Sequence, residues 1–489
     1  MRIMNKIQQL YKIRFLIIFS TFFITGCESW TDIDTDPDNI TAGPAITEDI
    51  MLIGIEAEWV ETANEKFETW YGYPTWLSWF AIEGSNAIVN VDPGFGNEVW
   101  NSYSYSLKHA VELHDFAEQN GNTYYQGIAG VIAAHHWFYI ADVYDQAPLE
   151  QAMTGLENQQ PELATQEELY AHANALLDEA INLFKNTDGG ELLPGQDDYM
   201  LNGDIDRWVR FAYSLKARQA MRRIYAPGVD QDAQISAILS YLEKGMTSNE
   251  DNVMWRHLED LANANPLYNY MTRAYSGGRG LTPGNFLIDM MNAYEDPRRP
   301  IMFTNAEADP NGYMGHFAGA AVQAGNRPSH YRFDYLSMSY PDHIMLYSES
   351  KFLEAEAYAF RNEWELAEIA MKEGNRADME YMEVPQEQII SYNAQPSLDM
   401  PTNLEDAQQL IIQQKYLSNI FRTGETYFDY VRTGYPEFDF EYMIQNTNAS
   451  TTFARRFPYP LNEIERNPNL SAVGQPDWFN KGTTWDNKN

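Results

Sequence analysis

The sequence of 489 residues contains a single cysteine and far fewer basic than acidic residues. One cysteine excludes disulfide bonds within the chain, and it excludes zinc or redox sites built on paired cysteines, because both need two thiols. The chain has 33 lysines and arginines and 70 aspartates and glutamates, which gives a formal net charge of −37. Such a chain repels the phosphates of nucleic acids, so we expect no nucleic-acid binding.

Long hydrophobic runs are also scarce, and the clearest one lies near the N-terminus. It extends from Phe15 to Ile24, follows a basic stretch and ends in Thr25-Gly26-Cys27. The run is too short for a membrane-spanning helix, which needs about 20 residues, so the pattern predicts a secretory signal peptide over residues 1–26. The ending resembles a bacterial lipobox, which makes Cys27 the lipidated first residue of the mature chain. We therefore expect contact with the membrane through this lipid anchor only.

Residues 27–44 form an acidic stretch with aspartates at every second position from Asp32 to Asp38. This spacing suggests a calcium loop, but Pro37 and Gly43 occupy the positions where such a loop requires glycine and glutamate. We interpret the stretch as a solvated tether. Removal of residues 1–26 changes the net charge from −37 to −41. Acidic residues directly behind a lipidated cysteine also resemble the surface-export signal of Bacteroidetes lipoproteins, which implies the outer face of the outer membrane.

Residues 45–489 contain no low-complexity linker, so we predict one domain. Thr165 and Glu168 form a capping box ahead of a run with helical periodicity, and Thr402 starts a similar signal. Segments 343–361 and 364–371 predict two helices joined by a short break, as in a tetratricopeptide (TPR) repeat, although no clean 34-residue period is present. We predict an all-α fold in which TPR-like helix pairs form the scaffold. Long irregular loops, expected at 86–96 and 268–332, form a binding face.

Motifs of catalysis and of metal binding are missing from the sequence. It contains no HExxH, GxSxG or GxxxxGK motif. We interpret His109, His114, His135 and His136 as packing or surface residues, and we predict neither a metal nor another cofactor. A pair of carboxylates for glycoside hydrolysis depends on spatial separation, so the sequence leaves that possibility open.

Several segments, in the expected order along the chain, resemble the SusD/RagB family of nutrient-binding outer-membrane lipoproteins, and most closely its SusD-like branch. The segments are DTDPDN at 34–39, IADVYDQAPLEQA at 140–152, RWVRFAYSLKAR at 207–218, SESKFLEAEA at 348–357, the stretch 414–436 and RRFPYPLNE at 455–463. The chain departs from the family pattern at Asp145, Gln146, Leu149, Gln151, Tyr213 and Val431.

Most residues of these segments have a structural interpretation. Trp208, Phe211 and Leu215 have the spacing of a buried helical stripe. Three arginines, at positions 432, 455 and 456, are expected to have a structural role and to pair with the many acidic residues of the chain.

The resemblance implies a helical fold with TPR-like pairs and a role without catalysis. It implies capture of a nutrient, commonly an oligosaccharide, and delivery to a SusC-like, TonB-dependent outer-membrane channel. Two alternatives stay open: a surface enzyme that degrades glycans, and a structural or adhesion lipoprotein.

For the ligand we expect aromatic rings and polar side chains on the two long loop regions. Stacking rings and hydrogen-bond donors converge on one shallow patch if the two regions meet. The candidates are Trp79 at the end of a helix, Asn86, Asn90 and Phe95 in the loop that follows it, and Tyr275, Arg279, Asn285, Tyr331 and Arg332 in the second region.

Overall fold

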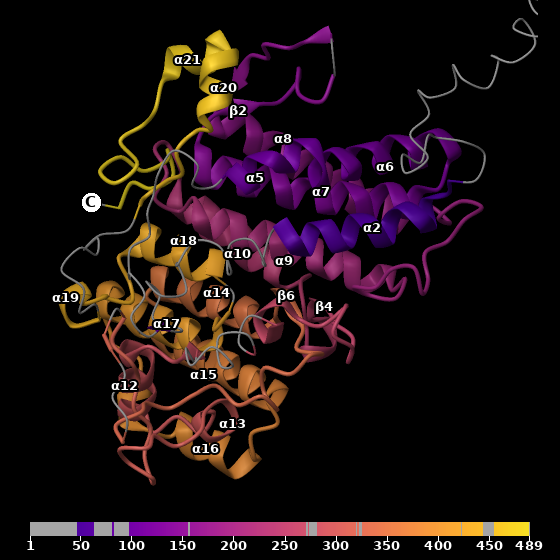
Figure 1. Ribbon diagram of the computed structural model, residues 1–489. Helices are drawn as coiled ribbons and strands as arrows, with labels where there is room; N and C mark the ends of the chain where they lie inside the picture. The colour runs from indigo at the N-terminus through magenta and orange to yellow at the C-terminus, as the bar shows by residue number, and fades with distance from the viewer. Residues whose placement is uncertain are drawn as a thin grey trace, which may run out of the picture. The chain divides into compact units, whose positions relative to one another are not determined.

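Helices make up most of the structure, and strands occur only as short pairs (Figure 1). The computed structural model describes residues 46–62, 81–82, 97–154, 157–269, 272, 281–318, 320–321, 325–421, 423–443 and 454–488. The predicted all-α fold is therefore confirmed. The strands of the described residues are antiparallel pairs: β1 (Ala81–Ile82) with β5 (Leu281–Thr282), β2 (Ala147–Pro148) with β3 (Leu163–Ala164), and β4 (Val253–Trp255) with β6 (Asp342–Met345).

The first half of the helical scaffold is built around one buried helix, α7. Its residues from Tyr125 to Tyr144 are buried, as expected for a helix that is apolar on all sides. It packs against α2, α6 and α8, and α9 packs against both α8 and α10. The bounds are α2 (Glu48–Val60), α6 (Ser106–Asn120), α7 (Thr123–Tyr144), α8 (Gln166–Asn186), α9 (Ile205–Arg222) and α10 (Gln231–Leu242).

The second half contains the helix pair that the sequence predicts. Helices α14 (Tyr347–Phe360) and α15 (Trp364–Tyr381) are joined by a short break and pack against each other, which confirms the TPR-like pair. Helix α14 also packs against α17 (Leu404–Ser418), and α15 packs against α16 (Gln386–Asn393). In Figure 1 these orange helices lie below α9, whereas α2, α6, α7 and α8 lie above it.

The prediction of a helix starting at residue 343 is wrong by four residues. Residues 342–345 form β6, which pairs with β4, and α14 begins only at Tyr347. The short apolar run His343–Met345 fits a buried strand as well as a helix, because periodicity cannot separate the two over so few residues.

Helix starts follow the predicted capping chemistry, with one shift. The capping box of Thr165 and Glu168 at the start of α8 is confirmed. At α17 the capping residue is Asn403 instead of Thr402, and its side chain accepts a hydrogen bond from the backbone N–H of Asp406. Both residue types are good helix caps, so the sequence signal fixed the helix start to within one residue.

The region 268–332, predicted to be loop, is partly helical in its described part, with helical residues at 268, 269 and 272 and in two further helices. Helix α12 (Asn285–Ala293) forms because Leu287, Ile288 and Met291 bury one face, and α13 (Arg299–Met302) follows it. The remaining short elements are α5 (Asn97–Asn101), η3 (Ser102–Ser104), η5 (Asn249–Asp251), η6 (Pro396–Leu398), α18 (Thr423–Thr433), α19 (Phe440–Met443), α20 (Leu461–Arg466) and α21 (Pro468–Val473).

The structural interpretation of the family-like segments is confirmed. Trp208, Phe211 and Leu215 are fully buried. Arg432 is buried and pairs with Glu356 and Asp429. The other two arginines bond to Asp486 and to the backbone carbonyl of Tyr144.

Residues from Glu48 onward form one compact unit. Within the described residues, every helix is either too short or too polar to cross a lipid bilayer.

Candidate functional site

A groove of about 670 Å³ lies where four segments far apart in the sequence meet. We call it the tyrosine groove. Its walls come from the end of β4, from α13, from the segment that precedes β6 and from the end of α15. The lining residues are Arg256, Pro300, Ile301, Arg332, Asp334, Tyr335, Tyr340, Pro341, Tyr381, Met382 and Glu383.

Three tyrosines give the groove an aromatic wall. The rings of Tyr335 and Tyr340 have centroids 5.4 Å apart, and their hydroxyl oxygens are 3.4 Å apart. The hydroxyl of Tyr381 lies 2.8 Å from Nε2 of His343, whose ring packs edge-on against Tyr340 at 5.7 Å. Burial raises the pKa of Tyr335 above its ordinary value, so its hydroxyl stays protonated and able to donate. The rings are therefore held in place before any ligand arrives.

A planar ion pair stands beside these rings. Nε and Nη2 of Arg332 donate to the two carboxylate oxygens of Asp334, at 2.9 Å and 2.5 Å. The pair raises the pKa of Arg332 and lowers that of Asp334, so both groups are ionised at neutral pH. The backbone N–H of Arg332 donates to the carbonyl of Met302 at 2.9 Å, which ties this segment to α13. The pair leaves guanidinium donors and carboxylate lone pairs available for neighbouring hydroxyl groups.

Arg256 adds a second guanidinium to the lining of the groove. It follows β4 directly, and the pairing of Trp255 with Asp342 fixes its position next to Pro341. The side chain is exposed, and it forms no ion pair with any residue that the structure describes. Its donors are therefore available to a ligand.

A much smaller pocket adjoins the groove. Tyr335, Tyr340 and Tyr381 also line this pocket, which has a volume of about 40 Å³. One wall of this pocket is Asp378, which accepts a hydrogen bond from buried Arg298 at 2.6 Å. The groove is thus much the larger of the two hollows that these tyrosines line.

Three of the residues predicted from sequence to bind ligand fall within the described parts, and one of them lines the groove. Arg332 is 41% exposed at its side chain. Tyr331 is 2% exposed because its ring packs between Phe303 and Phe421, at 4.9 and 5.1 Å. Asn285 is 3% exposed, and its Nδ2 donates to the carbonyl of Tyr442. The expected surface positions of Tyr331 and Asn285 are therefore corrected: both side chains belong to the interior.

The other predicted residues lie outside the described residues, and their roles stay predictions: Cys27, Trp79, Asn86, Asn90, Phe95, Tyr275 and Arg279. Ala81 pairs with Thr282 and Ile82 with Leu281, so β1, which precedes the first predicted loop, pairs with β5 in the second.

The tyrosines of the groove were missed from the sequence. A usable signal was present, because Tyr331, Phe333, Tyr335 and Tyr340 lie within ten residues around the end of the predicted loop. Tyr381 offered no such signal, since it is the last residue of an amphipathic helix.

Histidines inside the scaffold serve packing. His135 accepts a hydrogen bond from Nε1 of Trp59 at 3.0 Å, and Nε2 of His136 lies 2.5 Å from the hydroxyl of Ser106. Burial lowers the pKa of His136 to about 3, so the ring is neutral. In the parts of the chain that the structure describes, no three histidine or acidic side chains are grouped to hold a metal ion.

The fold is a helical scaffold that carries an open aromatic groove, and the comparisons with known proteins identify the family. Residues 46–460 match the model of the SusD-like family, described as "Starch-binding associating with outer membrane". The chain belongs to this family. No protein in the curated set matches the sequence.

Solved structures show the same fold. A SusD/RagB family protein from Bacteroides thetaiotaomicron is 22% identical, with a TM-score of 0.73, over 91% of this chain and 100% of its own. A SusD homologue from Bacteroides uniformis is 23% identical, with a TM-score of 0.74, over 90% and 99%. A chitin-binding SusD homologue from Flavobacterium johnsoniae is 20% identical, with a TM-score of 0.73, over 89% and 98%.

Proposed function

We propose that this protein is a lipid-anchored surface protein that captures an oligosaccharide in the tyrosine groove and delivers it to a SusC-like, TonB-dependent outer-membrane channel. The observation that carries the binding step is the meeting of three tyrosine rings and the Arg332–Asp334 pair in one open groove. The family description names starch, and one similar structure is of a chitin-binding protein. Both support a glycan as the ligand.

The chemistry of the groove suits a sugar. The apolar C–H faces of a pyranose ring stack on aromatic rings, while its hydroxyls both donate and accept hydrogen bonds. Tyr335, Tyr340 and Tyr381 provide the rings. Arg332 supplies donors and Asp334 acceptors next to them.

We propose that binding occurs without turnover. A glycoside hydrolase needs one carboxylic acid that stays protonated to assist the leaving group. Asp334 has the opposite character, because Arg332 lowers its pKa. A hydrolysis assay against starch and chitin tests this: the absence of product supports a binding role, and turnover abolished by Asp334→Asn would establish the enzyme alternative.

Calorimetry with the full-length lipoprotein in detergent tests the binding step. The double variant Tyr335→Ala/Tyr381→Ala should weaken binding of maltohexaose or chitohexaose at least about tenfold, or ~1.4 kcal/mol. Tyr105→Ala is the matched control, because Tyr105 is 44% exposed and lies outside the groove. Equal glycan affinity of the double variant and the control would contradict binding in the tyrosine groove. A thermal melt of each variant separates loss of the site from loss of the fold.

Anchoring and delivery need separate tests. Mass spectrometry of the mature N-terminus should show acyl chains on Cys27, and Cys27→Ala should release the protein from the membrane fraction. Co-purification from outer membranes should recover a channel subunit. Glycan uptake is then measured in cells that lack this protein. Normal uptake in those cells, although the channel subunit co-purifies with the wild-type protein, would favour the adhesion alternative.

A further inference from the structure

The charged groups of the tyrosine groove balance one another. Its lining contains two arginines and two carboxylates, so its formal charge is zero, although the whole chain carries −37. Arg332 and Asp334 bond to each other. The other two, Arg256 and Glu383, are exposed, and neither forms an ion pair with a residue in the described part of the chain. The groove therefore offers one unpaired donor group and one unpaired acceptor group, and its net charge selects neither an anion nor a cation.

Each of these two unpaired groups has an aliphatic neighbour in the lining. Arg256 lies next to Pro341, because the antiparallel register of β4 and β6 places the residue after β4 beside the residue before β6. Glu383 directly follows Met382, which is half-buried beyond the end of α15. Ile301 on α13 adds a further half-buried aliphatic side chain. The groove thus combines charged hydrogen-bonding groups with aliphatic surface, in addition to its tyrosine rings.

This combination fits an acetamido group better than it fits a hydroxyl group. The carbonyl of an acetamido group accepts a hydrogen bond from a guanidinium, its N–H donates to a carboxylate, and its methyl group contacts aliphatic side chains. The group is also uncharged, as the balance of the groove requires. A hexose without substituents has hydroxyls around its rim, and hydroxyls that face Pro341 or Met382 lose water without gaining a hydrogen bond, which costs free energy.

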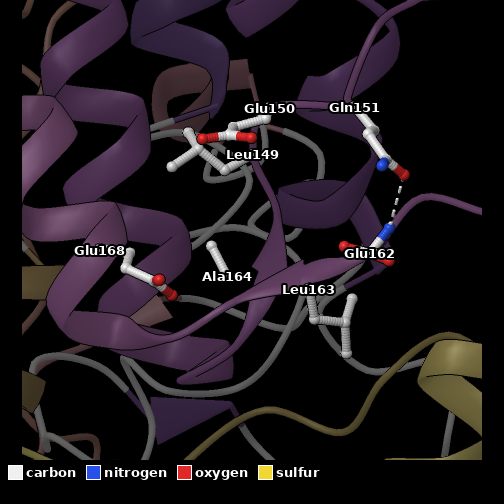
Figure 2. Close-up of a pocket in the computed structure, with 7 residues that line it drawn as sticks. All are labelled: Leu149, Glu150, Gln151, Glu162, Leu163, Ala164 and Glu168. Carbon is white, nitrogen blue, oxygen red and sulfur yellow. Dashed lines mark hydrogen bonds between the residues drawn. The ribbon is translucent and has the colours of Figure 1, made fainter.

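The hollow between the segment after β2, β3 and the start of α8 offers a contrast. Its volume is about 180 Å³, and Figure 2 shows a lining with three glutamates but no aromatic ring, lysine or arginine among the residues drawn. Oε1 of Gln151 already accepts the backbone N–H of Glu162 there, at 3.0 Å. That hollow has no ring to stack on a sugar and no cation to bind a carbonyl. The features that suit an acetamido sugar are therefore specific to the groove in this comparison.

We propose that the tyrosine groove is specific for glycans built from 2-acetamido sugars. In this assignment Arg256 binds the acetamido carbonyl and Glu383 binds the acetamido N–H. The inference rests on the proposed function, because it names the class of sugar that is bound in the groove. Glucans with a hydroxyl at C2 bind more weakly, and so do glycans with a free amine at C2, which lack both the carbonyl and the methyl group.

Calorimetry with the full-length lipoprotein in detergent tests this specificity. The probes are chitopentaose and cellopentaose, which share the β-1,4 backbone and differ only in the acetamido or hydroxyl group at C2 of each sugar, and fully deacetylated chitopentaose. The variants are Arg256→Leu and Glu383→Leu. Their matched controls are Arg466→Leu and Glu150→Leu, at exposed positions outside the groove. A thermal melt of each variant shows that the fold is intact.

We expect the wild type to bind chitopentaose at least about tenfold more tightly than either other probe, as one additional hydrogen bond to a charged group provides. Arg256→Leu and Glu383→Leu should each weaken the binding of chitopentaose and leave that of cellopentaose almost unchanged, so that the ratio of the two affinities falls. Both controls should keep the wild-type ratio.

Equal binding of chitopentaose and cellopentaose by the wild type would overturn the specificity, and so would tighter binding of the deacetylated probe. If these affinities are nevertheless lost in Tyr335→Ala/Tyr381→Ala, the proposed function stands without the specificity. A preference for chitopentaose that persists in that double variant would place acetamido recognition outside the groove. A ratio that Arg256→Leu or Glu383→Leu leaves unchanged would refute the role of that residue. Failure of all three probes to bind would contradict the proposed function as well.

Discussion

Arg218 on α9 donates from Nε and Nη2 to the two carboxylate oxygens of Glu349 on α14, each at 2.7 Å. The two side chains are 2% and 0% exposed, and 131 residues separate them in the sequence. Nη2 of Arg218 also donates to the carbonyl of Ile344 at 2.9 Å. This fully buried pair joins the first half of the helical scaffold to the second.

Removal of one partner of this pair should lower the free energy of unfolding far more than removal of both partners. Arg218→Met leaves Glu349 buried without its cation, which should lower the free energy of unfolding by about 3–5 kcal/mol. The double variant Arg218→Met/Glu349→Leu replaces the pair with apolar groups and should regain most of that loss. Urea denaturation followed by circular dichroism measures the stability of the wild type and of both variants. If the double variant is as unstable as Arg218→Met, then loss of the ion pair itself, and not the unpaired charge of Glu349, accounts for the loss of stability.

Glu56 on α2 should make the protein less stable at high pH. The side chain is fully buried, and its Oε2 accepts a hydrogen bond from the backbone N–H of Tyr199 at 2.8 Å. Burial and the neighbouring Asp198 raise the pKa of Glu56 well above its ordinary value. The folded state therefore holds a proton that the unfolded state loses near pH 4.3. Stability is fully present below that pH and falls as the pH rises towards the raised pKa.

The variant Glu56→Gln keeps the shape of the side chain without the titrating proton. Its free energy of unfolding should change less between pH 4 and pH 8 than that of the wild type, and it should be the more stable protein at pH 8. Urea denaturation across this range measures the slope. Glu118→Gln, at an exposed position of α6, is the control. Identical slopes for Glu56→Gln and the wild type would contradict the prediction.

The scaffold was predictable from the sequence because its signals are local. The capping box at Thr165 and the buried stripe of Trp208, Phe211 and Leu215 each depend on residues a few positions apart. Strand β6 was missed because its partner β4 lies about 90 residues earlier, and pairing over that distance leaves no periodic trace.

The groove was less predictable for the same reason. It joins Arg256, the segment 332–341 and Tyr381, and nothing local indicates that these meet. Among crowded aromatics the sequence also cannot tell which ring faces outward. Tyr331 is interior, whereas Tyr335, four residues later, lines the groove.

Two glycines in helices should respond in opposite ways to the same substitution. A Cβ atom at Gly374 on α15 would lie 3.0 Å from two ring atoms of Phe352 on α14, closer than normal contact. Gly374→Ala should therefore destabilise the protein by about 1–3 kcal/mol through overpacking of the helix pair. A Cβ atom at Gly54 on α2 would meet nothing within 4 Å. Gly54→Ala should stabilise by up to about 1 kcal/mol, because alanine is the better helix former. Thermal melts compare the two, and equal shifts in Tm would contradict the close approach of α14 and α15.

The capping box of α8 gives a prediction that depends on pH. The hydroxyl of Thr165 accepts the backbone N–H of Glu168 at 3.3 Å, and the Glu168 carboxylate accepts both the backbone N–H and the hydroxyl of Thr165 at 2.8 Å. These bonds lower the pKa of Glu168. Thr165→Ala should cost about 1 kcal/mol at neutral pH, as loss of a helix cap usually does.

Because the Glu168 pKa is lowered on folding, its contribution is present above the ordinary glutamate pKa and is lost as the pH falls through the folded value. The difference between the wild type and Thr165→Ala should therefore shrink below about pH 4, near the ordinary glutamate pKa. Thr165→Ser keeps the hydroxyl and should match the wild type at both pH values. Urea denaturation at pH 7 and at pH 3.5 measures this, and a cost for Thr165→Ala that is the same at both would show that the hydroxyl acts without help from the Glu168 carboxylate.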